Sequence, residues 1–200
     1  MAILFNISSK FENNAIAFFN TTINDSQADF YDDMVVFHDE DFNVSSVNLL
    51  NYKTADLGKN FKVLNANEFS ELESLILSKN NKYKIQKIKR FAIGKILKRE
   101  AHPKSQKLFV LEVDFKDAKR QIITNTTYTN EGKYFVWCLP GSITANGLKI
   151  TEGEILEVKS YGMLCSAQSL GFNDDEAKKL DELLQKCDDS YLGQEVSNLL

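Results

Sequence analysis

A series of short apolar segments between residues 91 and 159 limits the possible folds of this chain more than any other feature. In the second segment every second side chain is apolar and lies on one face of a strand, a face made of Phe109, Leu111, Val113 and Phe115. Turn-forming pairs such as Pro140-Gly141 and Asn146-Gly147 separate the segments. No intervening helix is long enough to connect parallel strands, so the pattern predicts a small antiparallel barrel. The five expected strands cover residues 91–97, 108–115, 121–124, 134–139 and 155–159.

Residues 1–81 are expected to form a separate, small α+β domain. Strand-like runs there cover residues 3–7, 15–19, 34–38 and 44–50. Helical spacing follows over residues 67–77, with Asn65 or Asn67 as the cap. Residues 78–83 have the composition of a linker. A second amphipathic helix is predicted over residues 174–187.

The predicted fold class is therefore α+β to mainly β. A small N-terminal α+β domain, residues 1–81, precedes a five-stranded barrel with a C-terminal helix, residues 82–200. The strand count fits the oligonucleotide-binding (OB) fold.

Charge is segregated along the chain, although the net charge is only −4. Residues 82–172 carry 16 basic and 8 acidic side chains, a charge of +8. Residues 1–81 sum to −7 and residues 173–200 to −5. A basic block between two acidic ones indicates where a polyanion would bind.

Several function classes find little support in the composition. No run of eighteen apolar residues or signal-peptide pattern is present, so we expect a soluble, cytoplasmic protein without membrane association. The three cysteines form no Cys-x-x-Cys pair, and neither a disulfide framework nor a zinc site or other cofactor is predicted. His38 lies beside Asp39, Glu40 and Asp41, where a solvated acidic turn is favoured over a metal site.

The basic side chains cluster around a predicted hairpin at residues 101–106. The cluster consists of Lys95, Lys98, Arg99, His102, Lys104 and Lys107. Such cations bind phosphates and release counterions, whereas the alternative is a lysine-rich surface that only keeps the protein soluble. Segregation of the charge favours binding. His102-Pro103 itself is interpreted as a structural turn.

Aromatic and small residues complete the candidate site. Tyr128 and Tyr134 are the expected exposed platforms for bases, whereas Trp137 is expected in the core. In the loop of residues 160–172, glycines such as Gly162 would let backbone N–H groups approach a ligand. Catalysis by its serines or by Cys165 is not expected, because no base lies nearby in sequence.

Four motifs follow one another in this part of the chain. They are His102-Pro103-Lys-Ser-Gln-Lys107-Leu108, Gln121-Ile-Ile-Thr-Asn, Leu139-Pro-Gly141 and Ser160-Tyr-Gly-Met-Leu-Cys-Ser-Ala-Gln-Ser-Leu-Gly-Phe172. In this order they resemble the tRNA-binding domain family. Its members occur in the bacterial phenylalanyl-tRNA synthetase β chain, in some methionyl-tRNA synthetases and as free-standing proteins. The resemblance covers about residues 90–172.

The resemblance implies an OB barrel that binds tRNA by its shape and backbone, without catalysis and often as a homodimer. Asn48-Leu-Leu-Asn51 and the short chain are similar to the free-standing, YtpR-type members. Where the family has a Gly-Ala-x-Asn-like segment, this chain has Asn125-Thr-Thr-Tyr128. By motif position, Lys107 and the loop of residues 160–166 carry over as binding elements. The predicted RNA-binding residues are Lys95, Lys98, Arg99, His102, Lys104, Lys107, Asn125, Tyr128, Lys159, Ser160, Gly162, Met163 and Ser166.

Two other functions stay open at this point. One is a protein-docking module that recruits an aminoacyl-tRNA synthetase or another translation factor through the acidic helix or residues 1–81. The other is an enzyme whose active site lies within residues 1–81. Only His38 and its acidic neighbours support this alternative.

Overall fold

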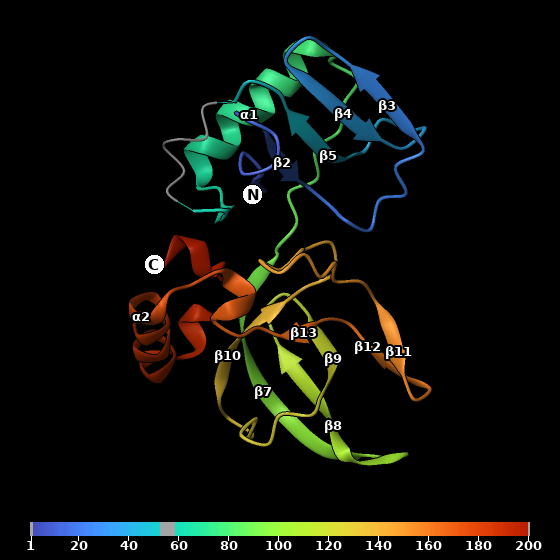
Figure 1. The fold of residues 1–200 in the computed structure, drawn as a ribbon. Coiled ribbons are helices and arrows are strands. Elements are labelled where there is room, and N and C mark those ends of the chain that lie inside the picture. Colours follow the sequence, from blue (N-terminus) through green and yellow to red (C-terminus); the bar gives the residue numbers. More distant parts are fainter. Residues whose placement is uncertain (1, 53–58, 200) are drawn as a thin grey trace. The chain divides into compact units, whose positions relative to one another are not determined.

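The computed structural model describes residues 2–52 and 59–199, and these form two compact units. Unit 1 comprises Met1–Ile88 with Gly141–Ile143, and unit 2 comprises Lys89–Pro140 with Thr144–Leu200. Within the described residues the structure is mostly β, with two α-helices (Figure 1). None of the described helices is long and apolar enough to cross a membrane.

Unit 1 is built on a six-stranded antiparallel sheet. Its strands are β1 (Ile3–Asn6), β2 (Ala15–Phe18), β3 (Gln27–Phe30), β4 (Met34–His38), β5 (Val44–Leu49) and β6 (Phe61–Val63). The order across the sheet is β3-β4-β5-β2-β1-β6. The four strands predicted from the sequence are confirmed, whereas β3 and β6 were not predicted.

Helix α1 (Ala66–Lys79) supplies one side of the core of unit 1. Asn65 caps it: the side chain of Asn65 accepts from the backbone N–H of Glu68, and the Glu68 carboxylate accepts from that of Asn65. The helix buries Phe69, Leu72 and Ile76. It continues into the segment 78–83 that we expected as a linker, and Tyr83 at the end of that segment is buried in the same core.

Unit 2 contains a five-stranded antiparallel sheet and a separate hairpin. The sheet consists of β7 (Phe91–His102), β8 (Ser105–Asp114), β9 (Lys119–Thr124), β10 (Tyr134–Cys138) and β13 (Met163–Leu164). Its order is β13-β10-β7-β8-β9, so the strand ladder is open, with β13 and β9 at its edges. The number of strands agrees with the prediction, but the ladder does not close into a barrel.

The predicted fifth strand, over residues 155–159, is wrong. This stretch forms the tip of the hairpin between β11 (Gly153–Ile155) and β12 (Val158–Ser160), and β13 takes the fifth place in the sheet. Leu156 and Glu157 have φ angles of 49° and 67°, which a strand does not allow. Their sequence gave no warning, because residues other than glycine rarely adopt positive φ.

The core of unit 2 confirms the predicted alternation along β8. Leu111, Val113 and Phe115 are fully buried, and Phe109 packs against them. Trp137 is also fully buried, as expected, and its indole Nε1–H donates to the carbonyl oxygen of Gly94 at 3.0 Å.

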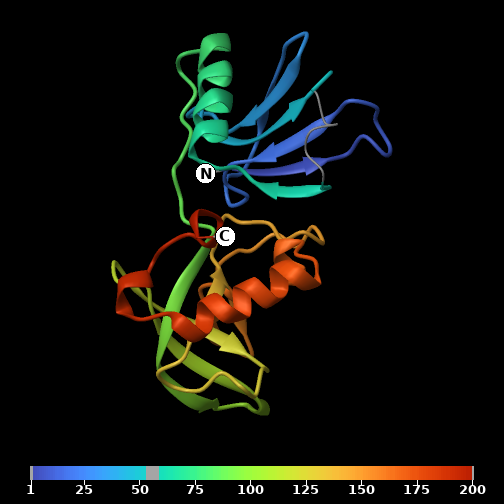
Figure 2. The ribbon, with the colours of Figure 1, turned by 90° about the vertical axis from the view of Figure 1, so that its left-hand side faces the viewer.

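The second helix, α2 (Asp174–Lys186), crosses in front of the strands of unit 2 in Figure 2. Asn173 and Glu176 form a capping box at its N-terminus. Of the predicted apolar stripe, Leu180 is buried, while Leu183 and Leu184 are half-buried. The chain then continues through short 3₁₀ turns, including Asp189–Tyr191.

Candidate nucleic-acid interface

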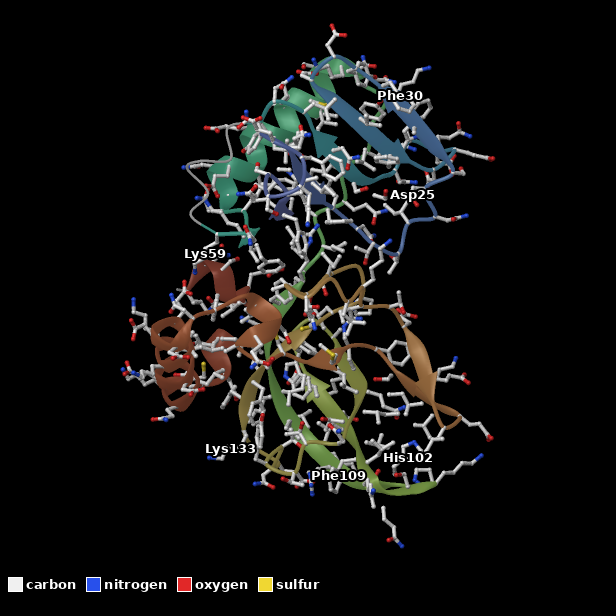
Figure 3. The ribbon with its side chains drawn as sticks, in the orientation of Figure 1. Asp25, Phe30, Lys59, His102, Phe109 and Lys133 are labelled. Atoms are coloured by element: carbon white, nitrogen blue, oxygen red, sulfur yellow. The ribbon has the colours of Figure 1, made fainter. Side chains whose placement is uncertain are left out.

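The hairpin of β7 and β8 carries the predicted basic cluster, and Figure 3 labels His102 at its turn. His102 lies at its turn and is only 4% exposed. The backbone N–H of Lys104 donates to His102 Nδ1 at 3.1 Å, so Nε2 carries the proton and donates to the carbonyl oxygen of Ile155 at 3.0 Å. Nδ1 of His102 therefore fixes the β7–β8 turn itself, and Nε2 joins this turn to the β11–β12 hairpin.

Three of the predicted cations are paired with carboxylates of the same unit. Lys95 Nζ lies 2.8 Å from Asp189 Oδ1, and Lys98 Nζ lies 2.7 Å from Glu100 Oε1. Lys104 pairs with Glu157. The hydrogen bonds to Asp189 and to Glu100 raise the pKa of Lys95 and Lys98 above the ordinary lysine value. These cations reach a phosphate only by exchanging their partners.

Arg99 is held by an aromatic ring. Its guanidinium carbon lies 3.5 Å from the centroid of Phe109, a cation–π contact. Its Nη2 is 3.5 Å from the carbonyl oxygen of Thr127. Arg99 therefore ties β7 to β8 and to the loop after β9.

Lys107 and Lys159 differ from the other predicted cations. Both side chains are exposed, and neither has a carboxylate within ion-pair distance in residues 2–52 and 59–199. Lys107 lies at the start of β8 and Lys159 in β12. Among the described residues, their ammonium groups could therefore bind a phosphate without giving up an ion pair, as Lys95, Lys98 and Lys104 would, or a cation–π contact, as Arg99 would.

The loop of residues 160–172 joins two edges of the sheet. Ser160 Oγ accepts from the backbone N–H of Ile123 in β9 and donates to the carbonyl oxygen of Gly162. Gly162 has a φ of 143°, and a Cβ there would lie 2.7 Å from the carbonyl oxygen of Cys138. Only glycine permits this close approach. Met163 then pairs with Cys138 in the ladder, so residues 160–163 connect β9 to β13 and β10.

The rest of this loop holds no activated nucleophile. Ser166 and Ser169 hydrogen-bond to each other at 3.0 Å. Burial, together with the neighbouring Cys138 thiol, raises the pKa of the Cys165 thiol, which disfavours the nucleophilic thiolate. Cys138, Cys165 and Cys187 are all free thiols.

The aromatic candidates divide by exposure. Tyr128 is 63% exposed, and its ring centroid lies 5.9 Å from that of Phe135. Tyr134 is half-buried and donates its hydroxyl hydrogen to Asp189. Asn125, which begins the same loop as Tyr128, is exposed. Of the predicted aromatic contacts, Tyr128 alone presents a largely open ring.

His38 in unit 1 does not lie in the solvated acidic turn that we expected. It is 4% exposed and stacks on Phe42, with ring centroids 5.2 Å apart. Its Nε2 lies 3.3 Å from Asp29 Oδ2. No group of three or more His, Cys, Asp or Glu side chains in the described part of the chain is arranged to hold a metal ion.

The sequence reasoning missed the residues that neutralise the basic cluster. Asp189 reaches Lys95 from 94 positions along the chain, and Glu157 reaches Lys104 from the other hairpin. No local pattern marks such pairs. Only the acidic character of residues 173–200 hinted that carboxylates lie near the basic block.

Comparison with known proteins gives a consistent result for unit 2. The family model described as "Putative tRNA binding domain" matches residues 91–194. A phenylalanine–tRNA ligase β subunit from Latilactobacillus sakei is 36% identical over 93 residues, which cover 46% of this chain and 12% of that protein. The "Putative tRNA-binding protein YtpR" of Bacillus subtilis is 32% identical over 90 residues, 45% of each chain.

This chain thus spans less than half the length of either relative. The solved structure of a MetRS-related protein from Pyrococcus horikoshii aligns with 52% of this chain and 76% of its own, at 21% identity and a TM-score of 0.32. The family match covers more than half of the 200 residues and includes all four motifs noted in the sequence. By this match, the chain belongs to the tRNA-binding domain family.

Proposed function

We propose that the second domain, expected to span residues 82–200, binds tRNA without catalysis through a basic OB-fold surface. The observation that carries this proposal is the family match over residues 91–194. This match overlaps the basic block over residues 91–172, which carry 11 basic and 8 acidic side chains. A protein that contacts phosphates mainly through lysines recognises the backbone and shape of an RNA more than its sequence.

The hydrogen bonds at the edge of the sheet support the OB barrel. Beyond the open ladder, the backbone N–H of Tyr161 donates to the carbonyl oxygen of Gln121 in β9 at 2.8 Å. The side chain of Gln121 donates to the carbonyl oxygen of Lys159 at 2.7 Å. These bonds link the chain that leads into β13 with the opposite edge strand.

Within this surface, Lys107 and Lys159 supply the first phosphate contacts, because both are unpaired in the described residues. Tyr128 and the loop of residues 160–166 border the same surface and set the fit to a folded RNA. Buried Ser160 and Gly162 act through the backbone that they fix. The homodimer implied by the family resemblance and the cytoplasmic location expected from the composition belong to the same proposal.

Direct binding of purified total tRNA to the full chain tests this function. We expect saturable binding that excess duplex DNA of equal phosphate concentration does not displace. Equal displacement by the DNA would reduce the activity to a general affinity for polyanions and would contradict the proposal. The mass of the protein in solution, with and without tRNA, tests the dimer.

A docking module is the second candidate, and helix α2 is the observation in its favour. Its first turn carries Asp174, Asp175 and Glu176, and its apolar stripe is only partly covered, with Leu183 and Leu184 half-exposed. A synthetase that is retained by the K104E/K107E double variant, when tRNA is not, would favour this function. Loss of both together would favour RNA binding.

A further inference from the structure

A pocket of about 420 Å³ opens on unit 2 beside the predicted site. Leu108 of β8, the stretch Ile123–Thr126 and Tyr128 form one wall. Ile155 of β11 and the stretch Met163–Ser166 form the other. Its volume lies within the range of about 300–1,000 Å³ that is typical of small-ligand sites.

The pocket carries no formal charge, although it lies in the most basic part of the chain. None of its lining residues is Asp, Glu, Lys, Arg or His. Its lining combines apolar side chains, with Ile123 buried and Met163 and Leu164 half-buried, with uncharged polar ones such as Thr124 and Ser166. A phosphate or carboxylate would lose its hydration there without gaining a cation, so an anionic group is disfavoured. A neutral, flat heterocycle has no charge to desolvate, so the pocket can accept it.

Two side chains of the loop after β9 suit a nucleobase. Tyr128 packs against Phe135 at a ring separation of 5.9 Å and is otherwise 63% exposed, so a held ring offers an open surface for stacking. Asn125 is exposed, and its amide has no hydrogen-bond partner among residues 2–52 and 59–199. An amide offers a donor and an acceptor side by side, which matches the edge of a base.

The unpaired lysines adjoin this pocket along the chain. Lys107 immediately precedes Leu108, and Lys159 lies in β12, which pairs with the strand that carries Ile155. An uncharged pocket whose lining residues are neighbours of free cations along the chain and across the β11–β12 hairpin suits the two parts of a nucleotide, the neutral base and the charged phosphate. We propose that the pocket receives one unpaired nucleobase of an RNA whose backbone runs along Lys107 and Lys159.

This inference rests on the proposed RNA-binding function. In addition, it requires that the RNA contain an unpaired base that is not stacked on its neighbours. RNA stem–loops present such bases, whereas a blunt RNA duplex presents phosphates alone. The test uses the full chain with two RNAs of equal length, one a stem–loop and the other a blunt duplex. It compares wild type with Tyr128→Ala, Tyr128→Phe and Phe30→Ala. Phe30 is a more open ring, 78% exposed, in unit 1.

Tyr128→Ala should weaken stem–loop binding by about 5- to 150-fold, the usual effect of losing one stacked base, and duplex binding by less than about twofold. Tyr128→Phe keeps the π-face and should bind like wild type, as should Phe30→Ala. Asn125→Ala should change the preference among stem–loops that differ in one loop base.

Three results would overturn the inference. Equal losses on stem–loop and duplex would make Tyr128 a contact to the backbone. Unchanged stem–loop binding in Tyr128→Ala would show that no base stacks on Tyr128 in the pocket, and it would not contradict the proposed function. Failure of the wild-type protein to bind either RNA would contradict both proposals. Fluorescence of the single tryptophan, Trp137, checks that unit 2 of each variant is folded.

Discussion

The ammonium group of Lys95 lies 2.8 Å from the carboxylate of Asp189, and the hydroxyl of Tyr134 donates to the same carboxylate. These hydrogen bonds lower the pKa of Asp189, so the carboxylate stays ionised at neutral pH. The acidic C-terminal segment therefore neutralises one cation of the basic block. Lys95 would bind RNA more readily without it.

Replacing Asp189 by asparagine should strengthen tRNA binding at low salt. The freed Lys95 would add up to one phosphate contact, which steepens the plot of log affinity against log salt by about 0.7–0.9. Asp181→Asn is the matched control, because it removes the same charge from an exposed position of α2. A slope that changes equally in both variants would show that net charge, and not the release of Lys95, is responsible.

Adding a methyl group at Gly94 should destabilise unit 2. A Cβ there would lie 2.7 Å from side-chain carbons of Phe115 and Val113 and 2.9 Å from one of Trp137. Overpacking of this kind costs about 1–3 kcal/mol of the free energy of unfolding. Urea unfolding followed by the fluorescence of Trp137, the only tryptophan, reports on this unit. Gly153→Ala is the control, since nothing lies within 4 Å of its Cβ, and an equal midpoint in the two variants would refute the packing argument.

Unit 1 should lose stability at alkaline pH through Tyr83. Burial, and then the hydrogen bonds to Asp29 and Tyr31, raise the pKa of Tyr83 above its ordinary value of 10.0. The folded state thus holds this proton more tightly than the unfolded state, so the contribution is fully present below pH 10 and is lost as the pH rises beyond it.

Ultraviolet titration of tyrosinate tests this. Compared with the wild type, Tyr83→Phe should lack tyrosinate absorbance in the titration step at the highest pH. In the wild type this step should coincide with the loss of the circular dichroism signal of the folded protein. Loss of amplitude near pH 10 instead would contradict the buried hydrogen-bonded position.

Much of the fold follows from local patterns. The alternation of Leu111, Val113 and Phe115 predicted the buried face of β8. Asn65 or Asn67 was predicted as the cap of a helix over residues 67–77, and the structure selects Asn65, with α1 beginning at Ala66. Strand β3 escaped notice because it is an edge strand whose residues are largely exposed, with Phe30 at 78%. An edge strand needs no apolar face, so its sequence carries no clear signal.

The candidate site was less predictable, because side-chain pairing depends on the tertiary fold. The sequence indicated a basic block but could not separate Lys107 from Lys104, since Glu157 becomes a neighbour of Lys104 only when two hairpins meet. Likewise, the pocket beside Tyr128 combines residues from β8 to the loop after β13. Contacts between residues so far apart in the sequence cannot be predicted from local periodicity.

Two matched double variants in a salt series test whether tRNA binds through the unpaired lysines. K107A/K159A removes two free cations, whereas K98A/K104A removes two cations that are paired with Glu100 and Glu157. Both lower the net charge equally. We predict that K107A/K159A reduces the salt slope of tRNA binding by about 1.4–1.8, for two phosphates at about 0.7–0.9 each, and that K98A/K104A reduces it by less than about half as much. A wild-type slope near zero, or equal reductions in the two double variants, would contradict tRNA binding at this surface.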